Sequence, residues 1–369
     1  MSAIANKVSL VAAILAPAVC CAERFVVGSN IGSEKFDALR VVSCDISSGS
    51  LKLEQEINGV GYVGSTYGVF SKDGSKFYTV IREKRGEKNL ASVVLYRVKD
   101  GRLGSMERIA DLPIGMPCHV ALSSDDRYFG FAAYTSAAFG TVDLKTGKMN
   151  YSRLLDVGMG PNIERQKKAY AHFIFFMPGS IGVIDLGCDA IHFFDNKSLE
   201  KKLTLKHDPG DGPRHAVWSK DNKFFYVLNE LSNSVTLYKY KKGKFARIAK
   251  YSTLPSEISD SIKTKAAAVK FSPDGRFLVC SNRGYDSLAI FKVDTITGTL
   301  KLAKIAKLNG EFPRDFEFTS NGKFVIVGHK KSNNFCTYEF CEQGESVNLR
   351  EVQNSRIEAF EPLYFGRIK

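Results

Sequence analysis

The chain has 369 residues, of which 44% are hydrophobic and 25% charged, a balance typical of a folded protein with a sizeable core. Its 52 Lys and Arg against 39 Asp and Glu leave a formal net charge of +13. The lysines are spread over many turns and do not form one basic run with interleaved aromatic residues, and no nucleic-acid-binding module accompanies them. The charge therefore suggests an anionic partner, and the sequence argues against nucleic acid.

The first 22 residues differ from the rest of the chain. Lys7 precedes the apolar run VSLVAAILAPAVCCA, and small residues lead up to Ala22. This pattern is typical of a secretory signal cleaved after Ala22, although a lipid-modified Cys20 is an alternative. The run is shorter than the roughly 20 apolar residues that span a membrane, and no later segment reaches that length. We therefore expect residues 1–22 to be a signal peptide and residues 23–369 to form an exported monomer, periplasmic or secreted, without an integral membrane segment.

Six cysteines follow the predicted signal: Cys44, Cys118, Cys188, Cys280, Cys336 and Cys341. None of them forms a CxxC motif or a Cys/His metal spacing, so we expect neither a structural zinc nor another cofactor. Cys336 and Cys341 lie an odd number of residues apart on one predicted strand, so they face opposite sides and do not readily pair. A disulfide elsewhere stays possible in an exported protein.

A pair of apolar strands around a short polar turn recurs six times, with a period of roughly fifty residues. The six units span residues 67–81, 119–134, 172–186, 215–230, 267–283 and 315–329. Their Asp-Gly, Asp-Asn and Asn-Gly turn pairs supply the positive backbone dihedrals that tight hairpins need. A third alternating strand follows each hairpin, and most units add a fourth. Four antiparallel strands per unit with almost no helical periodicity predict β-propeller blades.

The two ends of the chain supply a seventh unit. Phe25–Ser29, Leu39–Asp45 and Leu51–Ile57 read as three strands without an innermost partner, and Pro362–Arg367 near the C-terminus provides one. Joining both termini in one blade closes the ring and removes exposed sheet edges. The sequence therefore predicts an all-β, seven-bladed propeller in a single domain.

Several stretches resemble the lactonase family of seven-bladed propellers, which includes the propeller-type 6-phosphogluconolactonases and the 3-carboxy-cis,cis-muconate lactonizing enzyme. The resemblance is carried by GPRHAVWSKDNKFFYVLNE at 212–230, by FSPDGRFLVCSNRGYDSLAIFKVD at 271–294 and by FPRDFEFTSNGKF at 312–324. It extends over residues 24–369. The order and spacing of GPRH, NE, SNRG and FPRDF are more specific than the SPDG turns, which many propellers share.

The resemblance implies a catalytic site of His172, Arg214, Glu230 and Arg283. Departures from the family pattern lie elsewhere: Ile81-Arg82 stands where Asn-Glu is frequent, Ala133-Tyr134 where Asn-Tyr is usual, and Tyr170 two residues before His172 where some relatives have another histidine.

Hairpin geometry supports the same grouping, because the start of an innermost strand and the end of the second strand meet at one rim. By this argument Arg314, His119 and His329 also belong on that rim as substrate-binding candidates. His215 directly follows Arg214, so alternation predicts that its side chain faces the other way, in a structural role.

These residue types suit chemistry on a small anionic lactone or carboxylate. Arg214 and Arg283 can hold a carboxylate or phosphate and stabilise a developing oxyanion, Glu230 can act as a base, and His172 can move a proton. We expect hydrolysis of a sugar lactone such as 6-phosphogluconolactone, or the forming or opening of a lactone of a carboxymuconate-like dicarboxylate.

Two other functions are alternatives. One is a non-catalytic secreted propeller that acts as a binding or scaffold protein. The other is a metal-dependent lactonase with Asn229 and Asn282 as ligands. A Ser-centred elbow motif and a Gly-rich phosphate loop are both missing from the sequence, which argues against serine catalysis and nucleotide binding.

Overall fold

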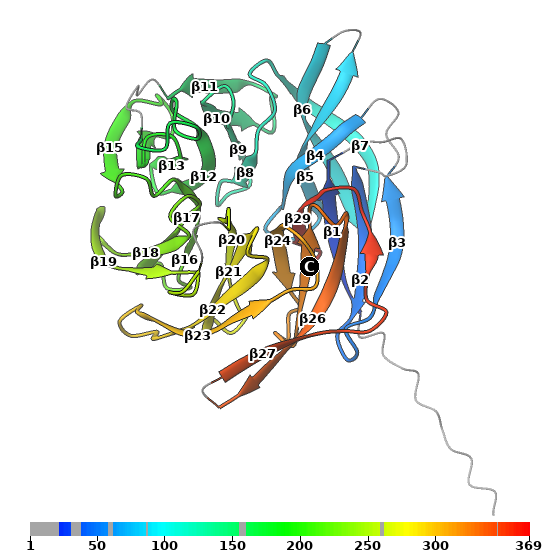
Figure 1. Ribbon diagram of the computed structural model, residues 1–369. Helices are drawn as coiled ribbons and strands as arrows, with labels where there is room; N and C mark the ends of the chain where they lie inside the picture. The colour runs from blue at the N-terminus through cyan, green and yellow to red at the C-terminus, as the bar shows by residue number, and fades with distance from the viewer. Residues whose placement is uncertain are drawn as a thin grey trace, which may run out of the picture.

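Seven antiparallel sheets form a closed ring in the computed structural model (Figure 1). The structure describes residues 22–30, 38–57, 62–85, 88–154, 160–258, 262–344 and 346–369. Within these ranges every regular element is a strand, which confirms the predicted all-β propeller. The predicted signal peptide falls almost wholly on residues 1–21, outside the described residues.

Each blade consists of four strands numbered from the ring axis outwards. Blade 1 contains β4 (Tyr62–Phe70), β5 (Lys76–Arg85), β6 (Lys88–Lys99) and β7 (Arg102–Leu112). Blade 2 contains β8 (His119–Leu122), β9 (Tyr128–Ala133), β10 (Ala138–Asp143) and β11 (Met149–Arg153). Blade 3 contains β12 (Ala171–Met177), β13 (Ser180–Asp185), β14 (Ala190–Asp195) and β15 (Lys201–Lys206).

The remaining blades follow the same plan. Blade 4 contains β16 (Pro213–Trp218), β17 (Phe224–Asn229), β18 (Ser234–Lys241) and β19 (Lys244–Ser252). Blade 5 contains β20 (Lys265–Phe271), β21 (Phe277–Arg283), β22 (Ser287–Val293) and β23 (Leu300–Lys307). Blade 6 contains β24 (Pro313–Phe318), β25 (Phe324–His329), β26 (Asn334–Gln343) and β27 (Ser346–Glu351), with the short β28 (Ile357–Glu358) paired to β26. Blade 7 contains β29 (Pro362–Arg367), β1 (Ala22–Ser29), β2 (Leu39–Asp45) and β3 (Leu51–Ile57).

The C-terminal strand closes the ring, as predicted. β29 pairs antiparallel with β1, from Phe25 opposite Arg367 to Ser29 opposite Pro362. The innermost strands β24, β29 and β4 contact one another in sequence around the axis. Tyr364 of β29 is fully buried, and its hydroxyl lies 2.8 Å from the Ser65 hydroxyl of blade 1. Both ends of the chain are therefore held by the same sheet.

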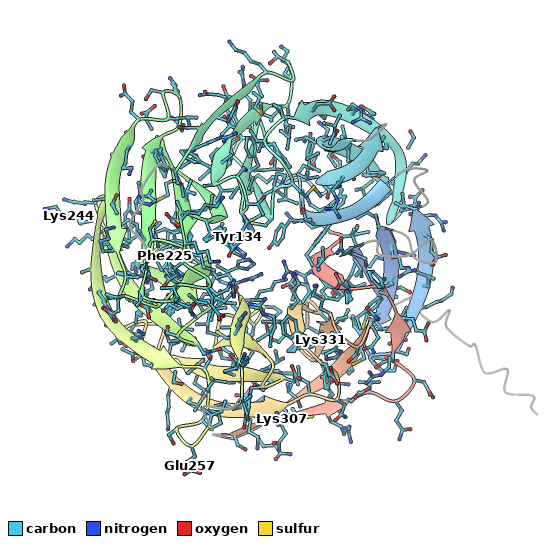
Figure 2. All side chains as sticks on the ribbon, turned by 45° about the horizontal axis from the view of Figure 1, so that its top comes forward. Tyr134, Phe225, Lys244, Glu257, Lys307 and Lys331 are labelled. Atoms are coloured by element: carbon cyan, nitrogen blue, oxygen red, sulfur yellow. The ribbon has the colours of Figure 1, made fainter. Side chains whose placement is uncertain are left out.

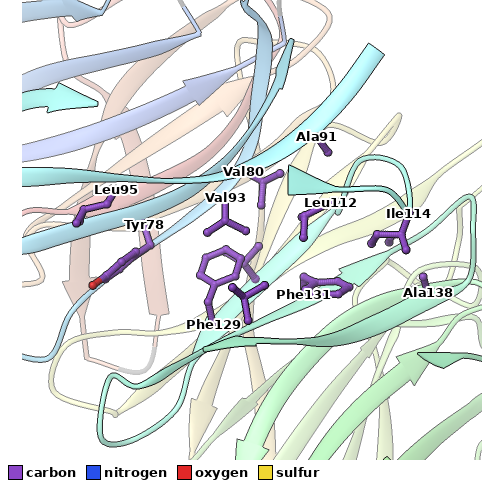
Figure 3. Packing of buried hydrophobic residues seen from close by; sticks show 13 residues of the cluster. Tyr78, Val80, Ala91, Val93, Leu95, Leu112, Ile114, Phe129, Phe131 and Ala138 are labelled. Atoms are coloured by element: carbon purple, nitrogen blue, oxygen red, sulfur yellow. The ribbon is translucent and has the colours of Figure 1, made fainter. Parts of the chain in front are cut away.

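Hydrophobic side chains fill the spaces between neighbouring blades. Between blades 1 and 2, Val80 and Val93 pack with Phe129 and Phe131, all with no exposed surface (Figure 3). Burial of one such side chain contributes about 1.5–3 kcal/mol. Strand alternation thus places the apolar residues against the adjacent blade.

The six hairpin turns have the backbone conformation that the sequence predicts. One residue at the same point of each turn has a positive φ, between 55° and 79°. These residues are Gly74, Asp126, Gly179, Asn222, Gly275 and Gly322. The turns lie at the end of the ring opposite to the strand termini discussed below, because each hairpin reverses there.

The structure also bears on the cysteines and on membrane association. The six cysteines that the structure describes form no disulfide with one another, and four of them are buried. In the described part of the chain there is no helix long and apolar enough to cross a membrane.

Candidate functional site

A β-bulge lies at the start of the innermost strand in blades 3, 4 and 6. In blade 4, Pro213 pairs with Asn229 and His215 pairs with Leu228, so that Arg214 is the additional residue. The additional residues of blades 3 and 6 are His172 and Arg314. A bulge redirects the side chain of its extra residue and is frequent beside functional sites. Three of the predicted site residues therefore occupy the same structural position in three blades, at one mouth of the ring.

The residue directly after the second strand supplies the other half of the rim. In blade 4 the pairing with the innermost strand ends at Asn229, and Glu230 comes next. In blade 5 Asn282 is followed by Arg283, which closes β21 and pairs with Lys265. In this register Tyr134 of blade 2 is the counterpart of Glu230. Figure 2 shows Tyr134 on the inner side of the ring, whereas Lys244 and Glu257 lie at its periphery.

Glu230 lies at the centre of a buried cluster with three arginines. Its Oε2 is 2.9 Å from Arg214 Nε and 2.8 Å from Arg283 Nη2, and its Oε1 accepts a 2.6 Å hydrogen bond from Arg165 Nη2. Burial alone would raise the pKa of Glu230, but the three arginine charges hold it well below its usual value. We call Glu230 with these arginines the Glu230 cluster. Its carboxylate is ionised at neutral pH and is a weak base.

Backbone carbonyls fix the two inner arginines. Arg214 Nη1 donates to the Ala267 carbonyl of blade 5, and Arg283 Nη2 donates to the Ala266 carbonyl at 2.9 Å. The Arg283 guanidinium also lies 5.3 Å from the centre of the Phe312 ring. Burial and the charges of Arg283 and Arg314 lower the pKa of Arg214. Two rigid guanidinium groups thus face one mouth of the channel, with a single carboxylate between them.

His172 lies next to this cluster, in aromatic surroundings. Its ring is 5.4 Å from that of His215 and 5.6 Å from that of Tyr134, and its buried Nδ1 has no hydrogen-bond partner in the described part of the chain. Burial and the Arg214 charge lower the pKa of His172 well below its usual 6.5. His172 is therefore neutral at pH 7.

His215 lies on the same side as Arg214, and the prediction that it faces away is wrong. Its Nε2 is 3.0 Å from Arg214 Nη1, and its ring is 5.6 Å from that of His119. The bulge at Arg214 breaks the strand alternation on which the prediction rested. His215 thereby lies in a layer below Arg214 together with His119 and Phe173, whose rings stack at 3.8 Å.

His119 thus lies among channel aromatics, where its Nδ1 accepts a hydrogen bond from the backbone of Ile174 at 3.3 Å. His329 is not brought together with the other candidates. Its side chain has no exposed surface, and its Nδ1 is 3.2 Å from Asn334 Oδ1 within blade 6. His329 occupies the register position of Asn229, one residue before the rim, so Lys330 and not His329 is the counterpart of Glu230.

The side-chain nitrogens of the two asparagines proposed as metal ligands donate inside their blades. Of the oxygens that would bind a metal, Asn282 Oδ1 accepts from the Thr253 hydroxyl at 2.7 Å, whereas Asn229 Oδ1 has no hydrogen-bond partner in the described part of the chain. Asn229 Nδ2 donates to Ser234 and Thr236, both at 2.9 Å, and Asn282 Nδ2 donates to the Thr253 carbonyl at 2.8 Å. Both side chains have no exposed surface. The described ranges contain no group of three His, Cys, Asp or Glu side chains arranged to hold a metal ion.

Sequence reasoning missed Arg165. It comes from the irregular segment between β11 and β12, where the repeat gives no register, and its Nη2 lies 3.4 Å from the Tyr134 hydroxyl as well as against Glu230. Arg82 and Lys330 were also missed as rim residues. They could have been found by aligning the residue after each second strand, since both share the position of Glu230.

Comparison with known proteins identifies the family of this chain. The family model described as "Lactonase, 7-bladed beta-propeller" matches residues 25–364. The chain belongs to this lactonase family. An uncharacterized protein of Staphylococcus saprophyticus is 34% identical over 264 residues, covering 69% of this chain and 75% of that protein. An uncharacterized protein of Staphylococcus aureus is 33% identical over 284 residues, which cover 74% of this chain and 81% of that protein.

Solved lactonase-family structures have the same fold. A putative 6-phosphogluconolactonase of Bacteroides fragilis matches with a TM-score of 0.80 at 23% identity, over 95% of this chain and 98% of its own. The periplasmic gluconolactonase of Pseudomonas aeruginosa matches with a TM-score of 0.82 at 23% identity, and the match covers 94% of this chain and 99% of that protein. At this level of identity the likeness establishes the propeller, and the activity has to be argued from the site.

Proposed function

We propose that this protein hydrolyses a lactone bearing an anionic group, such as 6-phosphogluconolactone. The observation that carries the proposal is the position of a neutral, unpartnered His172 beside two fixed arginines at one mouth of the channel. A base without a competing hydrogen bond and cationic groups for an oxyanion are the parts that ester hydrolysis needs. Membership in the lactonase family supports the same reaction class.

In the proposed reaction His172 takes a proton from water while the water oxygen attacks the lactone carbonyl carbon. Arg214 and Arg283 stabilise the resulting oxyanion. Collapse of this intermediate breaks the bond to the ring oxygen, which receives the proton from His172, and one water has been consumed to give a hydroxy acid. Glu230 holds the arginines in place, because its carboxylate is already paired with three guanidinium groups.

Steady-state hydrolysis of a lactone panel tests this proposal, with a His172→Gln variant and a His329→Asn control. Loss of a general base lowers kcat by roughly 10²–10⁴-fold, so His172→Gln should lose activity to that extent. His329→Asn changes an equally buried histidine to the residue that blades 4 and 5 have at that position, and it should leave kcat unchanged. Wild-type activity should persist below pH 6.5, because the lowered pKa keeps His172 neutral there. A full-activity His172→Gln enzyme would refute the assignment.

Two further functions have specific support. Several arginines at one mouth also suit a substrate with more than one carboxylate, which favours the forming or opening of a lactone of a carboxymuconate-like dicarboxylate. The complete pairing of Glu230 would serve a non-catalytic binding or scaffold propeller equally well, since such a cluster also joins blades 4 and 5. Lack of turnover on every lactone and dicarboxylate, together with tight binding of a protein partner, would favour the scaffold function.

We also propose that the mature protein is exported after cleavage at Ala22. The composition of residues 1–22 supports this, and one structural neighbour is described as periplasmic. Amino-terminal sequencing of protein from the extracytoplasmic fraction should give Glu23 as the first residue, whereas an intact N-terminus on cytosolic protein would contradict export.

A further inference from the structure

The rim of the mouth continues past the Glu230 cluster into a second group of cations. A pocket of about 280 Å³ lies between blades 1, 2, 6 and 7 at this end of the ring. Its lining includes Asn30, Thr66, Arg82, Cys118, Arg314 and Lys330. We call it the cationic pocket. The strand register explains its location, because Arg82 and Lys330 share the position of Glu230, and Arg314 that of Arg214.

The charges of this pocket are not balanced. Lys330 Nζ pairs with Glu361 at 3.1 Å, and the second oxygen of Glu361 accepts a 2.8 Å hydrogen bond from Asn30. Three cationic groups against one carboxylate leave a charge of +2 on Arg82 and Arg314. Neither arginine forms a hydrogen bond or ion pair with another described residue, and Arg82 Nε is buried without a partner. A buried donor of this kind is costly unless a ligand satisfies it.

The two halves of the mouth differ in this respect. Around Glu230 one carboxylate pairs with three arginines, whereas in the cationic pocket neither Arg82 nor Arg314 forms an ion pair with a carboxylate of the described chain. Burial and the nearby Arg283 charge lower the pKa of Arg314, which shows that the two halves interact electrostatically. An anion in the pocket would relieve this repulsion. Arginine is suited to the task, because its planar fork binds carboxylate and phosphate oxygens in pairs.

The cysteine in the pocket wall is not a thiolate nucleophile. Burial raises the pKa of the Cys118 thiol to about 11, so the thiol is protonated at neutral pH. Its Sγ is 3.3 Å from the His172 carbonyl, which places this wall directly beside the proposed catalytic residue. The pocket is therefore suited to hold part of a ligand that also reaches His172.

We propose that Arg82 and Arg314 bind the acidic substituent of the substrate, a phosphate monoester or a carboxylate, while the lactone ring lies at His172. This inference rests on the proposed function and adds to it the residues that select an anionic over a neutral lactone.

Calorimetric binding of three open-chain products tests the pocket without any need for turnover. Gluconate, glucarate and 6-phosphogluconate share a six-carbon chain and differ at C6, which has a hydroxyl, a carboxylate or a phosphate. Charge-assisted pairs of this kind change affinity by about tenfold or more, so wild type should bind glucarate or 6-phosphogluconate at least that much more tightly than gluconate. Arg82→Gln and Arg314→Gln should abolish the difference.

Matched controls separate a local effect from a change of net charge. Arg127→Gln removes the same charge from an exposed arginine paired with Asp143, in blade 2, and should keep the full preference. Arg82→Lys keeps the positive charge but lacks the planar guanidinium fork, so this variant should lose most of the preference for an anionic C6 group. Equal binding of the three products by wild type, or an unchanged preference in folded Arg82→Gln, would overturn the proposal. Inorganic phosphate bound as tightly as 6-phosphogluconate would assign the pocket to a free anion and overturn the substrate role.

Failure of this inference is distinguishable from failure of the proposed function. If wild type hydrolysed gluconolactone and Arg82→Gln did not change product binding, the proposed hydrolase function would stand and the proposed role of the cationic pocket would be wrong. If binding were selective and depended on Arg82 but the protein hydrolysed no lactone, the anion-binding role of the pocket would stand and the proposed hydrolase function would be wrong.

Discussion

Glu230 determines the charge balance of the proposed site. Its side chain is 3% exposed, and its two inner partners Arg214 and Arg283 are 2% and 7% exposed, so this pairing is shielded from solvent. Arg165 differs, because its side chain is 26% exposed and comes from an irregular segment. The two kinds of partner should therefore contribute very differently to stability.

Removing the carboxylate should be more harmful than removing the outer arginine. Glu230→Gln leaves two arginines buried without a counter-charge, and loss of one partner from a buried ion pair costs about 3–5 kcal/mol. Arg165→Gln leaves Glu230 paired with Arg214 and Arg283, and a partly exposed pair contributes about 1 kcal/mol or less. Urea unfolding monitored by circular dichroism measures both values. A Glu230→Gln protein as stable as wild type would show that this cluster does not depend on its carboxylate.

At the level of elements, ring closure depends on close packing of β29 against blades 7 and 1. The Tyr364 ring occupies space that Gly28 of β1 leaves open, since a Cβ on Gly28 would lie 1.8 Å from a Tyr364 ring carbon. Its hydroxyl reaches Ser65 and Thr79 of blade 1 at 2.8 and 3.3 Å. One side chain thus joins the two termini of the chain to the next blade.

Tyr364→Phe should weaken this closure without breaking it. The variant keeps the ring and removes the hydroxyl that Ser65 and Thr79 share, and leaving buried polar groups unpaired costs about 1–3 kcal/mol. Tyr128→Phe is the control, because Tyr128 is 36% exposed at the outer surface of blade 2. Thermal unfolding should show a lower Tm for Tyr364→Phe alone. Equal Tm values for the two variants would mean that closure relies on the β1–β29 backbone pairing.

The elements themselves were largely predictable. Alternating apolar strands and the positive-φ turn residues follow from local chemistry, and the missing inner strand of the seventh unit pointed to Pro362–Arg367. The site was harder, because a single bulge reverses the direction of one side chain. The bulge at Arg214 explains why the predicted orientation of His215 is wrong. In blade 6 the prediction chose the residue one position too early, because Lys330 shares the rim position of Glu230 and His329 lies inside the blade. Arg165 lies outside any repeat, so no periodic argument could locate it.

For the molecule as a whole, the channel is filled by rings from successive blades. Tyr67, His119, Phe173 and His215 contact one another around the axis, with ring centres 3.8 to 6.3 Å apart. Equivalent positions thus have histidine in two blades and phenylalanine or tyrosine in two others. Aromatic packing is what the fold requires there, and histidine adds sensitivity to pH.

Acid should therefore destabilise the propeller before its carboxylates titrate. Burial, with the Arg214 charge, lowers the pKa of His119, His172 and His215 well below 6.5 in the folded state. Below pH 6.5 the unfolded chain binds protons at these histidines and the folded chain does not, so stability falls as the pH falls. Each histidine contributes about 1.4 kcal/mol per pH unit in this range, or about 4 for all three.

Two opposite substitutions in the channel test the origin of this slope. His119→Phe introduces the residue that blade 3 has at the same position. It should reduce the loss of unfolding free energy between pH 6.5 and 5 by about a quarter, because burial also lowers the pKa of His329, to about 4. Phe173→His adds a further histidine to the channel and should steepen this loss by a similar amount. Urea titrations at a series of pH values give the slopes, and the groups facing these rings, Arg214 and Arg314, remain charged throughout. If both variants had the wild-type slope, the acid sensitivity would have to come from carboxylates outside the channel, and the three histidines would be protonated in the folded protein as readily as in the unfolded chain.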